Sequence, residues 1–157
     1  MKTLTIPNDV LIPEIGRILE SGHTATLRVK GVSMRPFLED GRDKVLLEPV
    51  GNNCLNIGDV VLANVGDRRY VLHRICKIEG DILILRGDGN AFGKEQCGRM
   101  DIIGKATAFY RKGREKPDSV DKWKWKLYSC LWPSSPFLRR IFLGLYRRVW
   151  LMSMRQY

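Results

Sequence analysis

The sequence predicts a mainly β fold: an antiparallel, partly barrel-like sheet with a short N-terminal helix and a helical C-terminal tail. Three observations support this. One amphipathic helical pattern opens the chain, and many short strand-like segments separated by turn residues follow it. The composition then changes after a polar segment at residues 112–121. We therefore divide the 157 residues into a β body, residues 1–112, and a basic, aromatic tail, residues 113–157.

The first predicted element is a helix over residues 8–21. Asn8 or Asp9 can cap its start, because short polar side chains accept bonds from the first free N–H groups. Gly22 can end it, since glycine tolerates the left-handed conformation that often follows a helix. The face expected to pack on the body carries Ile12, Ile15 and Leu19.

Strand-like segments follow from His23, where polar and apolar residues begin to alternate with a period of two. Turn residues such as Gly66-Asp67 and Gly80-Asp81 separate them. The predicted strands are residues 23–30, 44–48, 58–65, 69–78, 81–86 and 101–111.

The composition argues against several classes of protein. Hydrophobic residues make up 44% and charged residues 28%, which is typical of a folded chain. No apolar run of 18 residues and no secretory leader is recognisable. The four cysteines show no C-x-x-C spacing and only two histidines accompany them, so we expect free thiols, no metal site and no cofactor.

The tail carries most of the positive charge. Residues 119–157 hold eight Lys and Arg against one Asp, a net +7 of the total +10, which suggests an anionic partner. A helix is expected over residues 137–152, with an apolar face and arginines elsewhere. This face either lies in a membrane interface or packs on the body; nucleic-acid binding through the Trp-Lys repeat at 123–126 is a third alternative. The apolar face consists of Leu138, Ile141, Phe142, Leu145, Val149 and Met152.

Three residues of the body are candidates for chemistry, although each has a simpler interpretation. Ser33 lies between glycine and proline, where a serine usually stabilises a turn. His73, between Leu72 and Arg74, could be a half-buried strand residue, and Asp88 could be a turn former. However, the three residues occur in order within longer blocks of sequence, and this favours a role in chemistry.

Four blocks resemble, in order and separation, those of type I signal peptidases and of the related self-cleaving repressor peptidases, the S24/S26-like superfamily. The blocks are GVSMRPFL at residues 31–38, GDVV at 58–61, VLHRI at 71–75 and GDGN at 87–90. The resemblance spans about residues 23–107. In one respect the resemblance is to the endoplasmic-reticulum type of signal peptidase, because His73 stands where the bacterial enzymes have lysine.

The resemblance implies a Ser33 nucleophile and a His73 general base, because a serine hydroxyl is weak until a neighbour takes its proton. Asp88 is the expected residue that orients His73, with Asn90 or Glu95 as alternatives. The backbone N–H of Ser33 would also stabilise the oxyanion.

Two neighbours of the nucleophile also have implied roles. Met34 would pack beside the scissile bond, and Pro36 would hold the turn that presents the hydroxyl. Substrates of such enzymes bind as an added strand along a sheet edge.

The sequence departs from the pattern at Asp40-Gly41, at the extra glycine of GDGN and in lacking the usual N-terminal anchor. About thirty residues precede Ser33, too few for the DNA-binding domain of the repressors. We therefore expect an endopeptidase that cleaves a peptide or protein in trans, such as a leader or signal segment. A cytoplasmic location, peripheral at the membrane through residues 137–152, is expected. The alternatives are a non-catalytic interaction module and a nucleic-acid binder. The sequence does not indicate an oligomeric state.

Overall fold

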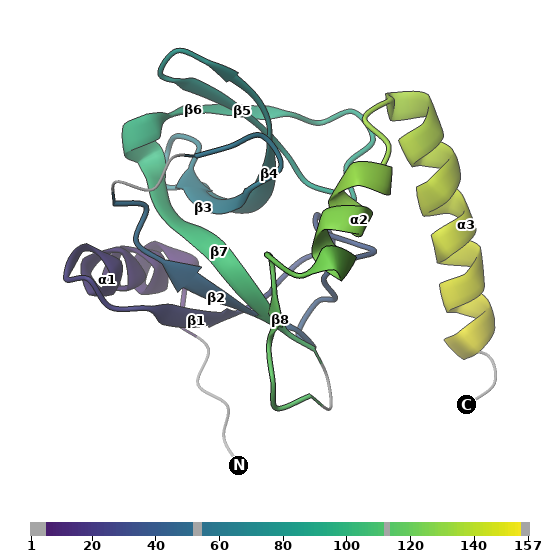
Figure 1. Cartoon of the computed structure of the whole chain (residues 1–157), viewed down its shortest axis with the longest axis horizontal. Helices are drawn as coiled ribbons and strands as arrows, with labels where there is room; N and C mark the ends of the chain where they lie inside the picture. Colours follow the sequence, from purple (N-terminus) through teal and green to yellow (C-terminus); the bar gives the residue numbers. More distant parts are fainter. Residues whose placement is uncertain (1–5, 52–54, 112–113, 155–157) are drawn as a thin grey trace.

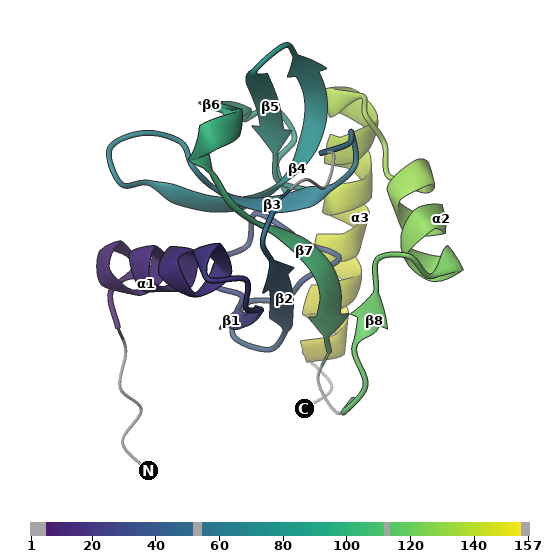
Figure 2. The ribbon, with the colours of Figure 1, turned by 60° about the vertical axis from the view of Figure 1, so that its left-hand side comes forward.

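The computed structural model describes residues 6–51, 55–111 and 114–154. A curved sheet forms the centre of the molecule, with α1 on one side and the C-terminal helices on the other (Figures 1 and 2). The helices are α1 (Asn8–Glu20), α2 (Trp123–Leu131) and α3 (Pro136–Met154), with a 3₁₀ turn at Arg99–Asp101. The strands are β1 (Ala25–Arg28), β2 (Lys44–Glu48), β3 (Val60–Asn64), β4 (Tyr70–Glu79), β5 (Ile82–Arg86), β6 (Glu95–Gly98), β7 (Ile102–Tyr110) and β8 (Asp118–Ser119).

The sheet has the order β1-β2-β7-β3-β4-β5-β6, with β8 added to β7, and its pairs are antiparallel. It closes about halfway into a barrel, which confirms the predicted mainly β fold with an N-terminal helix and C-terminal helices. The six predicted strands are present, most of them slightly shorter than expected. β6, β8 and α2 were not predicted, because EQCG and DS have too little apolar alternation and WKWKLYSCL lacks a capping residue.

Helix α1 packs on the sheet through the three apolar residues expected from the sequence, which are all buried. The predicted caps are wrong: Pro7 is the capping residue, and no side chain bonds the free N–H groups. Gly22, with φ of +84°, ends the helix as expected, and its N–H bonds to the carbonyl of Leu19. The carbonyl of Pro7 accepts the first bonds of the helix, from the N–H groups of Val10 at 3.1 Å and Leu11 at 2.9 Å.

The tail contributes to the core of the body. Trp125 on α2 is 9% exposed, and its ring centroid lies 4.2 Å from that of Phe37 and 4.9 Å from that of Phe109. Tyr128, one turn further on, extends this aromatic cluster, with its centroid 4.8 Å from Phe37. Polar contacts add to the packing, so α2 and α3 are held against the body by specific side chains.

Helix α3 packs on the body through a face other than the predicted apolar one. Arg139 is buried, Tyr146 and Trp150 are half-buried, and these three recur at helical spacing. The six residues of the predicted apolar face are 43–69% exposed. Among the described residues, no helix is both long and apolar enough to span a lipid bilayer.

Candidate active site

The segment after β1 places Ser33 at the surface of the body. Gly31, with φ of +90°, allows the chain to turn there, and its N–H bonds to Asp40 at 2.8 Å. Met34, one residue on, is 1% exposed and belongs to the core beneath α1. The buried Met34 side chain therefore anchors this segment to the core, while Ser33 itself is half-buried.

His73 is positioned by the middle of the sheet. It lies on β4 opposite Val61 of β3 and is 3% exposed. Its Nδ1 atom lies 3.0 Å from Oε2 of Glu95, the first residue of β6. A carboxylate only accepts hydrogen bonds, so this contact assigns the proton to Nδ1 and leaves Nε2 as the free acceptor.

Gly87 brings the serine segment and the histidine ring together. A Cβ atom added at Gly87 would lie 2.3 Å from the carbonyl oxygen of Ser33 and 3.0 Å from Nε2 of His73. The backbone carbonyl of Ser33 and the unbonded nitrogen of His73 therefore both lie close to the position that a side chain at Gly87 would occupy. Within the described residues, no hydrogen bond joins the Ser33 hydroxyl to the ring.

Gly89 supports the same contact from the next turn. Its N–H bonds to the Ser33 carbonyl at 2.7 Å, and an added Cβ would lie 2.5 Å from the carbonyl oxygen of Val32. Because Gly89 has no side chain, the backbone of the GDGN block can pack directly against the carbonyl groups of Val32 and Ser33. This is a geometric reason for the departure noted in the sequence.

The pKa of His73 is lowered from its ordinary value of 6.5. Burial is the largest cause, because it disfavours the charged ring, and it outweighs the opposing effect of the Glu95 carboxylate. The imidazole is accordingly neutral at pH 7 and can accept a proton at Nε2.

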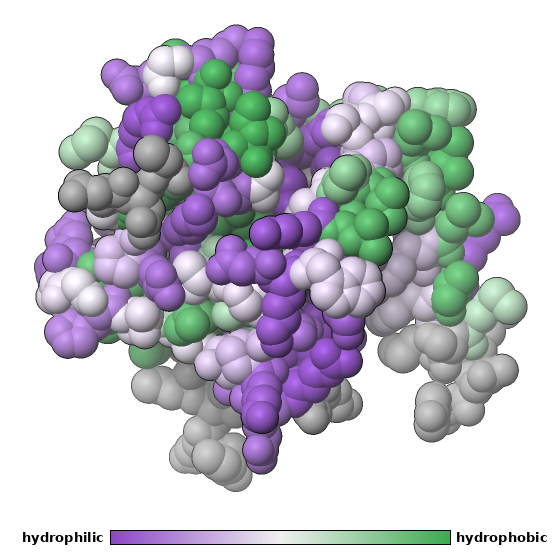
Figure 3. All heavy atoms as spheres, viewed as in Figure 1, coloured by the Kyte–Doolittle hydropathy of each residue, from purple (hydrophilic) through white to green (hydrophobic). Residues whose placement is uncertain are grey.

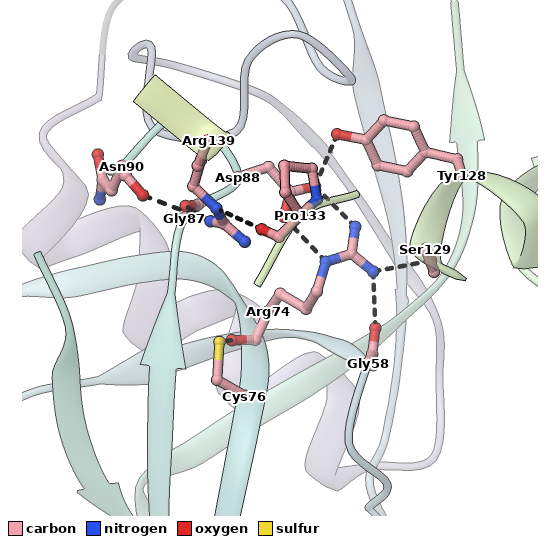
Figure 4. Close-up of polar contacts among 10 residues, drawn as sticks. All are labelled: Gly58, Arg74, Cys76, Gly87, Asp88, Asn90, Tyr128, Ser129, Pro133 and Arg139. Atoms are coloured by element: carbon pink, nitrogen blue, oxygen red, sulfur yellow. Dashed lines mark hydrogen bonds and ion pairs between the residues drawn. The ribbon is translucent and has the colours of Figure 1, made fainter. Parts of the chain in front are cut away.

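Asp88 does not bond the imidazole. Its carboxylate is fully buried and forms two bonds with Arg74, from Nε at 2.9 Å and from Nη2 at 2.6 Å (Figure 4). The Tyr128 hydroxyl donates a third bond at 3.1 Å. The expected contact of Asp88 with His73 is therefore corrected to Glu95, because the lone pairs of Asp88 are taken by a cation and a phenol.

Two further expectations change in the same way. Asn90 accepts a 3.4 Å bond from Arg139 through its backbone carbonyl and makes no contact with His73 among those described. The Met34 side chain is enclosed in the core, so it supports the loop instead of lining the surface beside a scissile bond. Pro36 does lie in the turn that carries Ser33, as expected, and its peptide bond with Arg35 is cis.

A match to known families covers this arrangement. The sequence model of the Peptidase S24-like family matches residues 2–107, which include Ser33, His73, Asp88 and Glu95. The chain belongs to the Peptidase S24-like family. No curated protein matches it significantly. The matched residues end within β7, and α2 and α3 lie outside them.

The S24-like body carries a groove whose lining residues come close in the sequence to the two candidate residues. The groove encloses about 700 Å³ and runs between α1, residues 24–30 and the start of β4. One wall precedes Ser33 in the chain, and the other, with Tyr70 and Leu72, precedes His73. Because β1 is an edge strand, its free edge could pair with an extended peptide.

The sequence did not reveal the polar network that joins Arg74 to α2, outside the matched residues. Arg74 also donates to the carbonyl of Gly58 and to the Ser129 hydroxyl, each at 2.9 Å, and lies over the Trp125 ring at 4.7 Å. Burial disfavours its charge, but the contact with Asp88 outweighs burial, and the pKa of Arg74 is raised. The position beside His73 was the only sequence signal for Arg74.

Arg139 fastens α3 to the same loop. It is 3% exposed and donates to the carbonyls of Pro133 at 3.0 Å and Gly87 at 2.9 Å (Figure 4). The helical spacing gave no signal for its burial, because an arginine on a helix is usually exposed. The loop that carries Gly87 thus packs against Ser33 and His73 and is also hydrogen-bonded to the tail through Arg139.

Proposed function

We propose that this S24-like protein is a serine endopeptidase resembling the signal peptidases, with Ser33 as nucleophile and His73 as general base. The observation that carries the proposal is that the Ser33 backbone carbonyl and Nε2 of His73 both lie close to Gly87, while Glu95 bonds the other ring nitrogen. A nucleophile, a base and an orienting group in this order are the minimum needed for acyl transfer.

In the proposed reaction, the Ser33 hydroxyl oxygen attacks the scissile carbonyl and its proton passes to Nε2 of His73. The bond between this hydroxyl and the ring would form with substrate bound, since catalytic bonds are often unmade without substrate. The Glu95 carboxylate stabilises the imidazolium that forms, and the imidazolium then protonates the leaving amine. Water attacks the acyl-enzyme in a second round, with His73 again as base.

The donors for the developing oxyanion come from the backbone in this proposal. The N–H of Ser33 makes no hydrogen bond within the described residues, so it is free to donate to the oxyanion. The substrate would be an extended peptide segment held by main-chain bonds along β1. Cleavage in trans fits the open groove beside this strand.

The test is labelling with a serine-directed acylating probe, followed by mass spectrometry of the modified peptide. Wild-type protein should be acylated at Ser33, whereas Ser33→Ala and His73→Ala should lose labelling by about 10²-fold or more. Ser135→Ala and His23→Ala are matched controls, because both residues are exposed and far from the site in sequence. A folded wild-type protein that is not acylated would instead support the non-catalytic interaction module.

A second proposal concerns location: α3 lies in the interface of an anionic membrane. The stripe of six apolar residues predicted to meet either lipid or the body is exposed, so packing on the body does not account for it. On the face seen in Figure 3, apolar side chains gather over α2 and along α3. Arg140, Arg147 and Arg148 are exposed on the same helix, and no acidic residue follows Asp121.

Charge decides between lipid and other occupants of this stripe. Each basic residue near an anionic bilayer contributes about 1 kcal/mol, and the apolar side chains add to this by leaving water. A second copy of the chain would bring equal positive charges together. An anionic lipid surface is therefore the occupant that satisfies both the stripe and its arginines.

Vesicle sedimentation tests this location. The protein should bind phosphatidylserine vesicles, weakly bind phosphatidylcholine vesicles, and lose binding on Leu145→Glu. Met100→Glu is the matched control, since Met100 is 97% exposed but lies on the body. If Leu145→Glu instead converts a dimer to a monomer and wild type ignores vesicles, the stripe is an interface between copies and the lipid proposal is wrong.

A further inference from the structure

Helix α3 is joined directly to the segment that carries Ser33. The Tyr146 hydroxyl donates to Oε1 of Glu39, and the Arg35 guanidinium lies 3.0 Å from Oε2 of the same carboxylate. Burial and this hydrogen bond raise the pKa of Tyr146 to about 12. Arg35 also lies over the Trp150 ring, 5.3 Å from its centroid. The last turns of α3 are thereby held close to residues 31–36, the nucleophile segment.

A pocket of about 410 Å³ remains between the two elements. Val32, next to Ser33, and Gly89, whose N–H bonds to the Ser33 carbonyl, form one side. Leu143, Trp150 and Leu151 of α3 form the other. The size suits one or two side chains of a peptide, and the walls are mainly apolar.

The charged groups of the pocket share one sign. Arg35 and Arg147 both line it, and no lining residue is acidic. The Nε atom of Arg35 is buried without a hydrogen-bond partner in the described part of the chain. Glu39 pairs with the terminal nitrogen of Arg35, but Arg147 has no carboxylate partner among the described ion pairs. An apolar side chain next to a carboxylate would therefore match the pocket.

The pocket and the groove along β1 are bounded by different helices. They have no lining residue in common, and α1 and α3, which bound them, lie on opposite sides of the sheet (Figures 1 and 2). Lys30 lines the groove and Arg35 lines the pocket, so Ser33 lies between the two sites in the chain. The two sites would thus contact the substrate on either side of the bond to be cut.

We propose that α3, which lies outside the residues matched to the S24-like family, supplies a substrate pocket across the scissile bond from the β1 groove, selective for an apolar residue beside an acidic one. This inference rests on the proposed peptidase function for its meaning, although peptide binding can be measured without catalysis. It gives the tail a part in specificity, in addition to its packing on the body.

Binding is measured with full-length Ser33→Ala protein and fluorescent eight-residue peptides that carry Leu-Asp, Leu-Asn or Leu-Lys near one end. The Leu-Asp peptide should bind at least tenfold more tightly than the other two. Arg147→Glu in the same background should abolish this preference, while Arg148→Glu, exposed one residue further on, should retain it. Equal binding of the three peptides, or equal effects of the two charge reversals, would overturn the pocket.

Acylation by a small probe that does not reach the pocket separates this proposal from the catalytic one. Wild-type protein should be acylated at Ser33 by this probe. If acylation fails while Leu-Asp selectivity is present, the peptidase proposal fails and the pocket stands as a peptide-binding site. If acylation occurs without selectivity, the pocket proposal alone is wrong.

Discussion

At the scale of single residues, the two carboxylates near His73 have different partners and so different expected roles. Glu95 bonds the ring nitrogen Nδ1 at 3.0 Å, whereas Asp88 is enclosed by Arg74 and Tyr128. Residue type alone did not separate them, because both follow His73 at short distances in the chain. Two substitutions can now test the difference.

The Glu95→Gln variant is expected to retain the ring contact through its amide oxygen but to lose the negative charge. Without that charge the imidazolium is less stable, so kcat/KM should fall by about tenfold or more. Activity requires neutral His73 and is lost as pH falls through a pKa below 6.5. Because Glu95 raises this pKa, the acidic limb should move to lower pH in the variant. The control Glu79→Gln, at an exposed position on β4, should change neither the acidic limb nor the plateau of the pH profile of kcat/KM.

The Asp88→Ala variant is expected to unfold more easily instead of merely losing activity. It would leave the buried guanidinium of Arg74 without its carboxylate, which typically costs about 3–5 kcal/mol. Chemical denaturation measures this, with Glu14→Ala as the control, because Glu14 pairs with Arg17 at an exposed position worth under about 1 kcal/mol. A stable but inactive Asp88→Ala protein would restore the original expectation that Asp88 orients His73.

At the scale of elements, the loop between β5 and β6 is what joins the candidate residues. It carries Gly87 against the Ser33 carbonyl and leads into Glu95 at the start of β6. The sequence located the GDGN block but interpreted its acid as the functional member. Its glycines matter for geometry instead, and contacts of this kind cannot be seen before the segments are folded together.

The Gly87→Ala variant tests the role of this loop. Its Cβ would lie 2.3 Å from the Ser33 carbonyl oxygen and 3.0 Å from Nε2 of His73, so one of them must move. A displacement of about 1 Å at reacting groups can cost 10²-fold, and the acylation rate should fall by about this factor. Gly93→Ala, in the same loop with nothing within 4 Å, should behave as wild type. Equal rates for the two variants would contradict the close approach.

The sequence predicted well those elements whose pattern reflects a single packing surface. α1, β1 and β2 pack one face on the body, so periodicity placed them within a few residues, whereas β3, buried on both faces, was placed by its apolar run between turn residues. α2 was missed and the choice between lipid and body for the apolar face of α3 stayed open, since both depend on contacts made by Trp125 and Arg139 with distant strands and loops. An apolar stripe that remains exposed gives the same pattern as one that is buried.

At the scale of the whole molecule, the tail is structurally part of the body although the family match ends before it. The division at residues 112–113 predicts that changes in α2 leave the body unaffected. The structure predicts otherwise, because α2 closes an aromatic cluster with Phe37, next to the nucleophile segment, and with Phe109 of β7. Loss of this cluster should therefore disturb both stability and the site.

Two tryptophans that are two residues apart decide between these views. Trp125→Ala removes a ring that is 9% exposed and should lower the free energy of unfolding by about 3–5 kcal/mol. Trp123→Ala removes one that is 68% exposed and should change it by less than about 0.5 kcal/mol. Denaturant titration followed by circular dichroism measures both, and the acylation rate of Ser33 reports on the site. Equal stabilities would show that the tail is independent of the body; a selective loss in Trp125→Ala would show that the S24-like body depends on its tail to hold the nucleophile segment in place.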